Sequence, residues 1–168
     1  MQVIRYVAKL NHLRHGHSLS ACAQHVNNTE AQKVSLRFLL ALSGGLEILA
    51  GLPALITPAP LISLLLGGPV DPIASVLARL FGAGVFALGL ACLKARDDVR
   101  SSAGQAVSLG ITAYNVLAAV VLIWTAAASD FGGLLLWVAG IGHAPLGALF
   151  VLALTRIIHE ASAASADA

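Results

Sequence analysis

Charged side chains are scarce in this sequence of 168 residues: Asp, Glu, Lys and Arg make up 11% of it, whereas hydrophobic residues make up 58%. A chain this short cannot bury so many apolar side chains in one water-soluble core. Aromatic residues are also few, at 5%, and the ten Lys and Arg residues form no basic stripe of the kind that binds nucleic acid. The composition therefore excludes a soluble globular domain and a nucleic-acid-binding protein, and it indicates a partner of another kind, the lipid bilayer.

Cysteine is almost absent as well. Only Cys22 and Cys92 occur, and they form no CxxC pair. Both are expected near the cytoplasmic side of a membrane, where thiols stay reduced. We therefore predict neither a structural disulfide nor a chemical role for either residue.

Four long apolar runs dominate the chain. A hydrocarbon layer about 30 Å thick requires about 20 helical residues to cross it. Runs of that length cover residues 35–57, 74–93, 103–128 and 131–154. They are too long and too continuous for the strands of a transmembrane barrel. We therefore predict an all-α fold, a transmembrane four-helix bundle, over residues 35–155.

The positions of Lys and Arg predict the orientation of the bundle, because positively charged segments stay on the cytoplasmic side. Apart from Arg79, these residues precede the first run or lie at its start, occupy the connection between the second and third runs, and follow the fourth run at Arg156. The other two connections, 59–73 and 129–130, contain none. Both tails, 1–34 and 156–168, are therefore expected in the cytoplasm, and four crossings agree with that.

Outside the four runs the chain predicts little structure. Apolar residues at helical spacing in segment 1–34 allow a short amphipathic helix on the membrane surface, and disorder is the alternative. Its histidines, among them His12, His15 and His17, match no closed metal motif, so we predict no metal site there. Segment 61–66 is too short to cross a membrane, and we expect it to form an interfacial or re-entrant helix.

Each apolar run carries strongly polar groups at a similar depth. Glu47 lies about ten residues, roughly 15 Å, from the outer end of the first run, and His143 lies about twelve residues into the fourth run from outside. Tyr114 and Asn115 lie about twelve residues into the third run from inside. Arg79 lies about five residues into the second run, and its long side chain reaches inward toward Glu47. We predict that these five side chains form one polar layer that lines a ligand-binding site.

Three further features favour a site at this depth. A carboxyl in the middle of a bilayer costs roughly 2.5 to 3.5 kcal/mol, so it normally faces protein or water. Small residues such as Gly44 and Gly51 share the helix face of Glu47 and allow a neighbouring helix to approach. Pro53 and Pro145 each free a backbone carbonyl near the polar layer, and in lipid such a carbonyl must be satisfied by protein or water. A hydrated or ligand-filled pocket is consistent with all three features.

A purely structural interpretation stands beside this one. Glu47 and Arg79 would then form a buried ion pair that only fixes the packing of the first two helices. His143 would be a hydrogen-bonded core histidine. The coincidence of an acid, a base, a phenol and an amide at one depth favours a functional site, because ionisable groups inside a membrane usually mark pathways or sites.

The stretches LSGGLEILAGLPALI and ARLFGAGVFALGL resemble the helices of small bacterial four-span membrane proteins of the DoxX-like type and of related uncharacterised families. The resemblance covers residues 36–155 and leaves the N-terminal tail out. It implies a four-helix fold in a bacterial inner membrane. No catalytic residue is carried over by it.

Three functions remain open. The leading one is binding or transfer of an apolar or amphipathic small molecule in an intramembrane pocket whose polar end is the predicted layer. The second is a membrane-embedded enzyme that transfers a proton on a lipophilic substrate, with Glu47 as acid or base and His143 or Tyr114 as proton donor. The third is an accessory subunit of a larger membrane complex, or a homo-oligomer, in which the polar layer serves assembly. The sequence specifies neither the ligand nor a cofactor.

Overall fold

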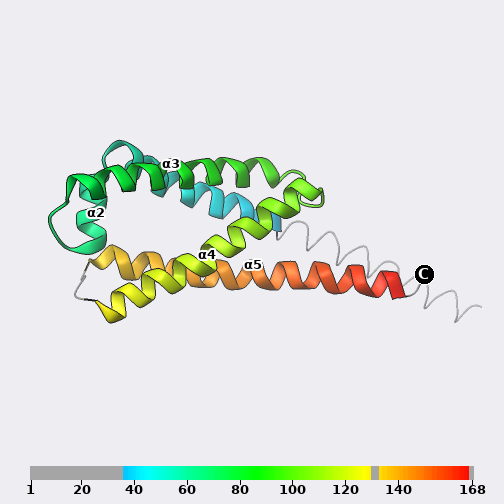
Figure 1. Ribbon diagram of the computed structural model, residues 1–168. Helices are drawn as coiled ribbons and strands as arrows, with labels where there is room; N and C mark the ends of the chain where they lie inside the picture. Colours follow the sequence, from blue (N-terminus) through cyan, green and yellow to red (C-terminus); the bar gives the residue numbers. More distant parts are fainter. Residues whose placement is uncertain (1–35, 130–132, 167–168) are drawn as a thin grey trace, which may run out of the picture. The chain divides into compact units, whose positions relative to one another are not determined.

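The computed structural model describes residues 36–129 and 133–166, and within them the chain is helical (Figure 1). The first helix covers Leu36–Ile56. The labelled helices that follow are α2 (Pro58–Leu66), α3 (Pro72–Ala95), α4 (Ser102–Ala128) and α5 (Leu134–Ala166). All but α2 are long and apolar enough to cross a membrane, which confirms the predicted all-helical chain with four candidate spans. The predictions for residues 1–34 and for Asp130 lie outside the described residues.

The helices begin and end at local signals in the sequence. Asp71 caps α3: its carboxylate accepts a hydrogen bond of 2.6 Å from a backbone N–H in the first turn, and a proline follows directly. Ser101 caps α4, because its hydroxyl oxygen accepts from the Gly104 N–H at 3.0 Å. Gly67 ends α2 with φ of 76°, a left-handed conformation that glycine adopts without a steric penalty. α2 is the short helix that was expected near residues 61–66, and its presence confirms that prediction.

The last helix is longer than its apolar run. α5 continues to Ala166, although the part that is long and apolar enough to span a membrane ends at His159. Most of segment 156–168, expected as a tail, is therefore helical. The segment is rich in alanine, the best helix former, and contains neither proline nor glycine to end the helix.

The first helix and α3 approach each other through paired glycines. A Cβ atom at position 44 would lie 2.8 Å from the Gly89 carbonyl oxygen, and one at position 51 would lie 2.8 Å from the Gly82 carbonyl oxygen. On each helix the two glycines are seven residues apart, about two turns, and so share one face. We call Gly44, Gly51, Gly82 and Gly89 the glycine seam. It confirms the prediction that small residues let these helices pack closely.

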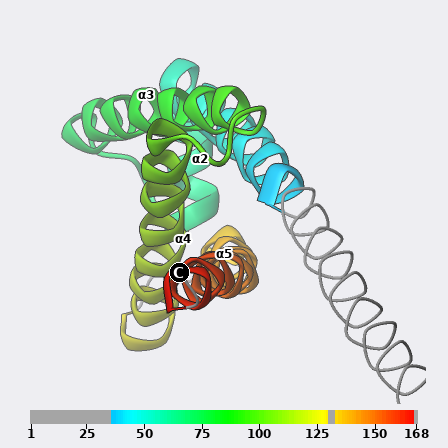
Figure 2. The same ribbon diagram turned by 90° about the vertical axis from the view of Figure 1, so that its right-hand side faces the viewer.

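The most extensive contact between labelled helices joins α4 to α5 (Figure 2). Glycines again allow the approach: a Cβ at Gly140 would lie 2.9 Å from Cγ1 of Ile123, and one at Gly147 would lie 3.0 Å from Cγ2 of Val116. α3 also contacts α4, and α2 contacts both α3 and α5. The four long helices therefore form a connected set.

A buried hydrophobic cluster joins residues from all four long helices: Leu36, Leu39, Leu40, Cys92, Val99, Ile111, Phe150 and Ala153. Beside it, Arg37 Nη2 of the first helix lies 3.0 Å from Asp97 Oδ1 in the α3–α4 connection. Both of these side chains are exposed, so the ion pair contributes at most about 1 kcal/mol to stability. Apolar packing, rather than charge, holds this end of the helices together.

Candidate functional site

Asn115 links three of the membrane helices. Its side chain is completely buried in α4. The amide nitrogen donates to the Ile111 carbonyl at 2.9 Å and lies 3.4 Å from the Ser43 hydroxyl oxygen of the first helix. The amide oxygen lies 2.9 Å from Nδ1 of His143 in α5. One side chain thus ties the first helix, α4 and α5 together through polar contacts.

The contacts of Asn115 also determine which nitrogen of His143 carries a proton. The amide atom that faces the Ile111 carbonyl must be the nitrogen, because two carbonyl oxygens have no proton to share. The atom that faces His143 is therefore the oxygen, which can only accept. Nδ1 of His143 must donate to it, so the proton of a neutral imidazole lies on Nδ1 and Nε2 is an acceptor.

Glu47 and Tyr114 form the second half of the site. The Glu47 side chain belongs to the first helix and is only 3% exposed. Its carboxyl faces the Tyr114 hydroxyl within interaction range. The Tyr114 ring meets the His143 ring edge to face, with centroids 5.5 Å apart and planes at 87°. Tyr114 therefore connects the carboxyl to the imidazole.

We call these connected residues the polar cluster: Ser43, Glu47, Tyr114, Asn115 and His143. Four of them are site residues predicted from the sequence, and counting along the helices correctly placed them at one level. Ser43 was not among the predicted site residues. Its position four residues before Glu47, on the same face of the helix, was the signal that it could join the cluster.

Arg79 does not join the polar cluster. Its side chain is exposed, and no ion pair between Arg79 and Glu47 forms within the described part of the chain. Arg79 and Val85 each lie three residues from Gly82, which is about 300° of helical rotation, or about 60° short of a full turn. They therefore lie on opposite sides of Gly82, and it is the Val85 side that is buried. The expected approach of Arg79 to Glu47 is therefore wrong for a single chain, because the glycine seam turns Arg79 outward.

The remaining polar groups near the cluster are satisfied inside their own helix. Ser108 donates to the Gly104 carbonyl at 2.8 Å, and Thr112 donates to the Ser108 carbonyl at 2.6 Å. Cys92 of α3 is buried and close enough to Glu47 to interact with it electrostatically. Nothing in the sequence predicted that the two residues would be neighbours. In the described residues no group of three or more His, Cys, Asp or Glu is placed to hold a metal ion. Any polar recognition by this site therefore falls to the polar cluster.

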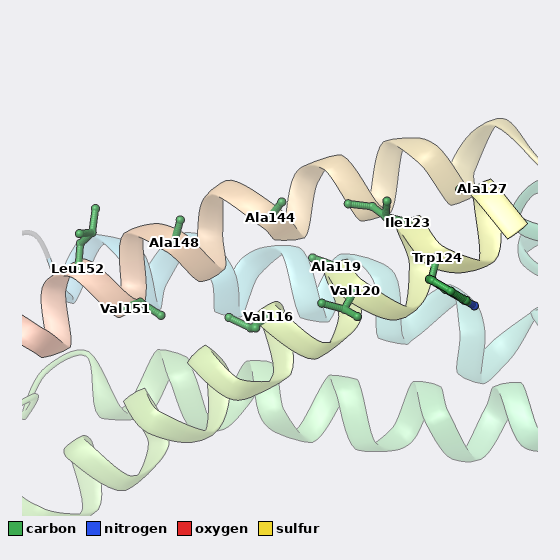
Figure 3. A pocket seen from close by; sticks show the side chains of 10 residues that line it. All are labelled: Val116, Ala119, Val120, Ile123, Trp124, Ala127, Ala144, Ala148, Val151 and Leu152. Carbon is green, nitrogen blue, oxygen red and sulfur yellow. The ribbon is translucent and has the colours of Figure 1, made fainter.

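An apolar groove of about 780 Å³ lies along α4 and α5 (Figure 3). Its walls carry Val116, Ala119, Val120, Ile123, Trp124, Ala127, Ala144, Ala148, Val151 and Leu152. Val116 directly follows Asn115, and Ala144 directly follows His143, but no residue of the polar cluster lines the groove. Such walls suit hydrocarbon, and the volume is within the range of small-molecule pockets.

The same helices thus carry a buried polar cluster and an apolar groove. A buried carboxyl, a phenol, an amide and an imidazole can hold or move a proton, and the groove can hold a hydrocarbon chain. Comparison with known proteins leaves the resemblance to DoxX-like proteins a prediction: neither a family model, nor a curated protein, nor a solved structure matches the chain.

Proposed function

We propose that this protein is a small multi-pass membrane protein that binds or transfers an apolar or amphipathic small molecule. The polar cluster recognises the polar group of the ligand, and the groove between α4 and α5 takes the apolar part. The observation that carries the proposal is the fully buried Asn115, which is bonded to His143 between the same two helices that line an apolar groove. Polar groups inside a membrane are costly, and they are usually kept where they bind or conduct.

The proposed location is a bacterial inner membrane with both termini in the cytoplasm. Lys94, Arg96 and Arg100 surround the α3–α4 connection, and Arg156 lies near the end of the last span. Cationic residues at these two places and their absence from the opposite connections support this orientation. The resemblance to bacterial four-span proteins supports the inner membrane.

A second candidate function is proton transfer on a lipophilic substrate. Tyr114 favours it, because this residue contacts both a carboxyl and an imidazole, Glu47 and His143. A substrate beside these groups would meet an acid and a base at once. Turnover separates the two functions: membrane lipid extract incubated with the purified protein changes chemically, by isomerisation or by redox, only if the protein is an enzyme.

Retention of a small molecule tests the leading proposal. Native mass spectrometry of the full-length protein in mild detergent should find a bound small molecule, and Glu47→Ala and His143→Ala should weaken its binding by about fivefold, since each removes a polar contact worth about 1 kcal/mol. Leu117→Ala is the matched control, because Leu117 is 63% exposed on α4 and does not line the groove. Wild-type protein without any bound molecule would contradict the proposal.

Arg79 offers a contrasting prediction. It is exposed and lies away from the polar cluster, so Arg79→Gln should leave ligand occupancy within about twofold of wild type, as surface substitutions usually do. If the protein is an accessory subunit, the same variant should instead weaken copurification with its complex, because a cation facing out of the bundle requires an anionic partner. If Arg79→Gln loses as much ligand as Glu47→Ala does, Arg79 is part of the binding site. The same mass spectra report both results.

A further inference from the structure

Arg79 carries a charge on a helix face that the described chain leaves uncovered. Its side chain is exposed on α3, and it forms no hydrogen bond or ion pair with another residue that the structure describes. A guanidinium does not lose its proton in proteins, so the charge persists inside the membrane. Such a charge requires an anionic partner or contact with water. The partner of Arg79 must therefore be sought beyond these residues.

The position of Arg79 along α3 brings its charge to the edge of the hydrocarbon layer. The 24 residues of α3 span about 36 Å, about 6 Å more than the layer they cross. With α3 centred in the layer, Arg79, seven residues after Pro72, has its Cα about 7 Å inside the nearer surface. Side chains on a helix point back toward its N-terminus, which is that nearer end, and an arginine reaches about 6 Å. The guanidinium thus reaches the level of the lipid phosphates.

The short helix α2 supports this placement of the surface. Its nine residues cover about 14 Å, too little to cross a membrane, and it contacts α3 at the end where α3 begins (Figure 1). At that end the carboxylate of Asp71 caps α3. A charged cap beside a helix too short to span is expected at the membrane surface and not within the hydrocarbon.

Below Arg79 the same face of α3 is apolar. Ala83, Phe86 and Leu90 follow Arg79 by four, seven and eleven residues, spacings that keep side chains on one side of a helix. None of the three is buried by the rest of the described chain. This face therefore presents a cation at the level of the headgroups and hydrocarbon beneath it, a pattern that is complementary to an anionic lipid.

A second copy of the chain offers no acid that matches the guanidinium. Two copies with the same orientation in one membrane present the same groups at the same depth. Of the acids in the described residues, Glu47 is buried. Asp97, Asp98 and Glu160 lie beyond the opposite ends of the spans. Asp71 comes nearest, but its carboxylate already caps α3. A lipid phosphate meets the requirement better than another protomer does.

We propose that Arg79 binds the phosphate of an anionic glycerophospholipid, whose acyl chain lies along the apolar face of α3. The planar guanidinium donates two parallel hydrogen bonds to two phosphate oxygens, a geometry that arginine favours. The lipid site is separate from the polar cluster and from the α4–α5 groove. It therefore adds a second site to the one in the proposed function and does not depend on the ligand proposed there.

Binding of two matched lipids tests the phosphate contact. Dioleoylphosphatidylglycerol and dioleoylglycerol have the same acyl chains, but only the first carries a phosphate. Native mass spectrometry of the full-length protein in a mild nonionic detergent measures the affinity of the tightest site for each. Wild type should bind phosphatidylglycerol about tenfold more tightly, as charge-assisted hydrogen bonds provide. Arg79→Gln should abolish this preference. Arg100→Gln, which removes an exposed cation at the α3–α4 connection, should leave it intact.

The outcomes separate this site from the proposed function. Equal affinities of wild type for the two lipids overturn the inference, and so does a preference that survives Arg79→Gln. A dimer that disappears in Arg79→Gln while lipid binding is unchanged overturns it as well, in favour of a second copy. Glu47→Ala should leave the lipid preference unchanged, because Glu47 belongs to the polar cluster and not to this face.

If Arg79→Gln does not fold, carbon–phosphorus NMR decides instead. Wild-type protein labelled at arginine is measured in phosphatidylglycerol bilayers, and the signal of Arg79 is identified by its absence from the spectrum of Arg79→Lys. Its guanidinium carbon should show direct contact with a lipid phosphorus. Lack of that contact overturns the inference.

Discussion

Gly51→Val is expected to lower the free energy of unfolding by about 3 kcal/mol, at the upper end of what overpacking usually costs. A Cβ at this position would lie 2.7 Å from the backbone nitrogen of Phe86 and 2.8 Å from the carbonyl oxygen of Gly82. Both atoms belong to the backbone of α3, so no side-chain rotation can relieve the contact. The two helices must move apart, and that movement also weakens the Gly44–Gly89 contact two turns away. Equilibrium unfolding in mixed micelles, followed by circular dichroism, measures the loss.

Gly45→Val on the same helix is the matched control. A Cβ at Gly45 meets no atom within 4 Å, and the residue is exposed. The change from glycine to valine alters helix propensity in the same way at both positions, so the difference between the two variants isolates the crowding at the glycine seam. Equal stabilities of the two variants would show that the first helix and α3 do not depend on close backbone contact.

The spans could be predicted well because membrane thickness and helix signals act locally. Prolines stand at the first positions of α2 and α3, within two residues of the predicted run boundaries. The end of α5 at Ala166 could not be predicted from hydropathy, because leaving the membrane does not end a helix. A helix ends where capping or breaking residues occur, and the alanine-rich end of this chain has neither proline nor glycine.

For the candidate site, the sequence predicted how deep each side chain lies in the membrane but not which way it points. A rise of about 1.5 Å per residue makes depth countable, and it correctly placed Glu47, Asn115 and His143 at one level. Direction depends on which face of each helix is buried, and that is set by contacts between distant segments. Arg79 was expected to face inward because its side chain is long enough, but the packing of α3 turned it outward. Whether the cluster binds a ligand stays a prediction.

Asn115→Leu is expected to lower the free energy of unfolding by about 2 kcal/mol. Leucine branches at Cγ as asparagine does and is larger, so the loss comes from hydrogen bonds and crowding rather than from a cavity. Nδ1–H of His143 loses its acceptor in a medium of low dielectric constant, and the Ser43 hydroxyl loses a neighbour 3.4 Å away. An unsatisfied buried group costs about 1 to 3 kcal/mol, and interhelical hydrogen bonds in membranes contribute about 0.6 to 2 kcal/mol. The same mixed-micelle unfolding experiment measures it.

A double-mutant cycle with His143→Phe shows whether the loss belongs to this contact. Once the imidazole is gone, Asn115→Leu should cost at least about 1 kcal/mol less than in wild type, because no Nδ1–H is left unpaired. Ser43→Ala should cost less than Asn115→Leu, since the distance of 3.4 Å marks a weak hydrogen bond. Additive effects at positions 115 and 143 would mean that the 2.9 Å contact does not couple α4 to α5.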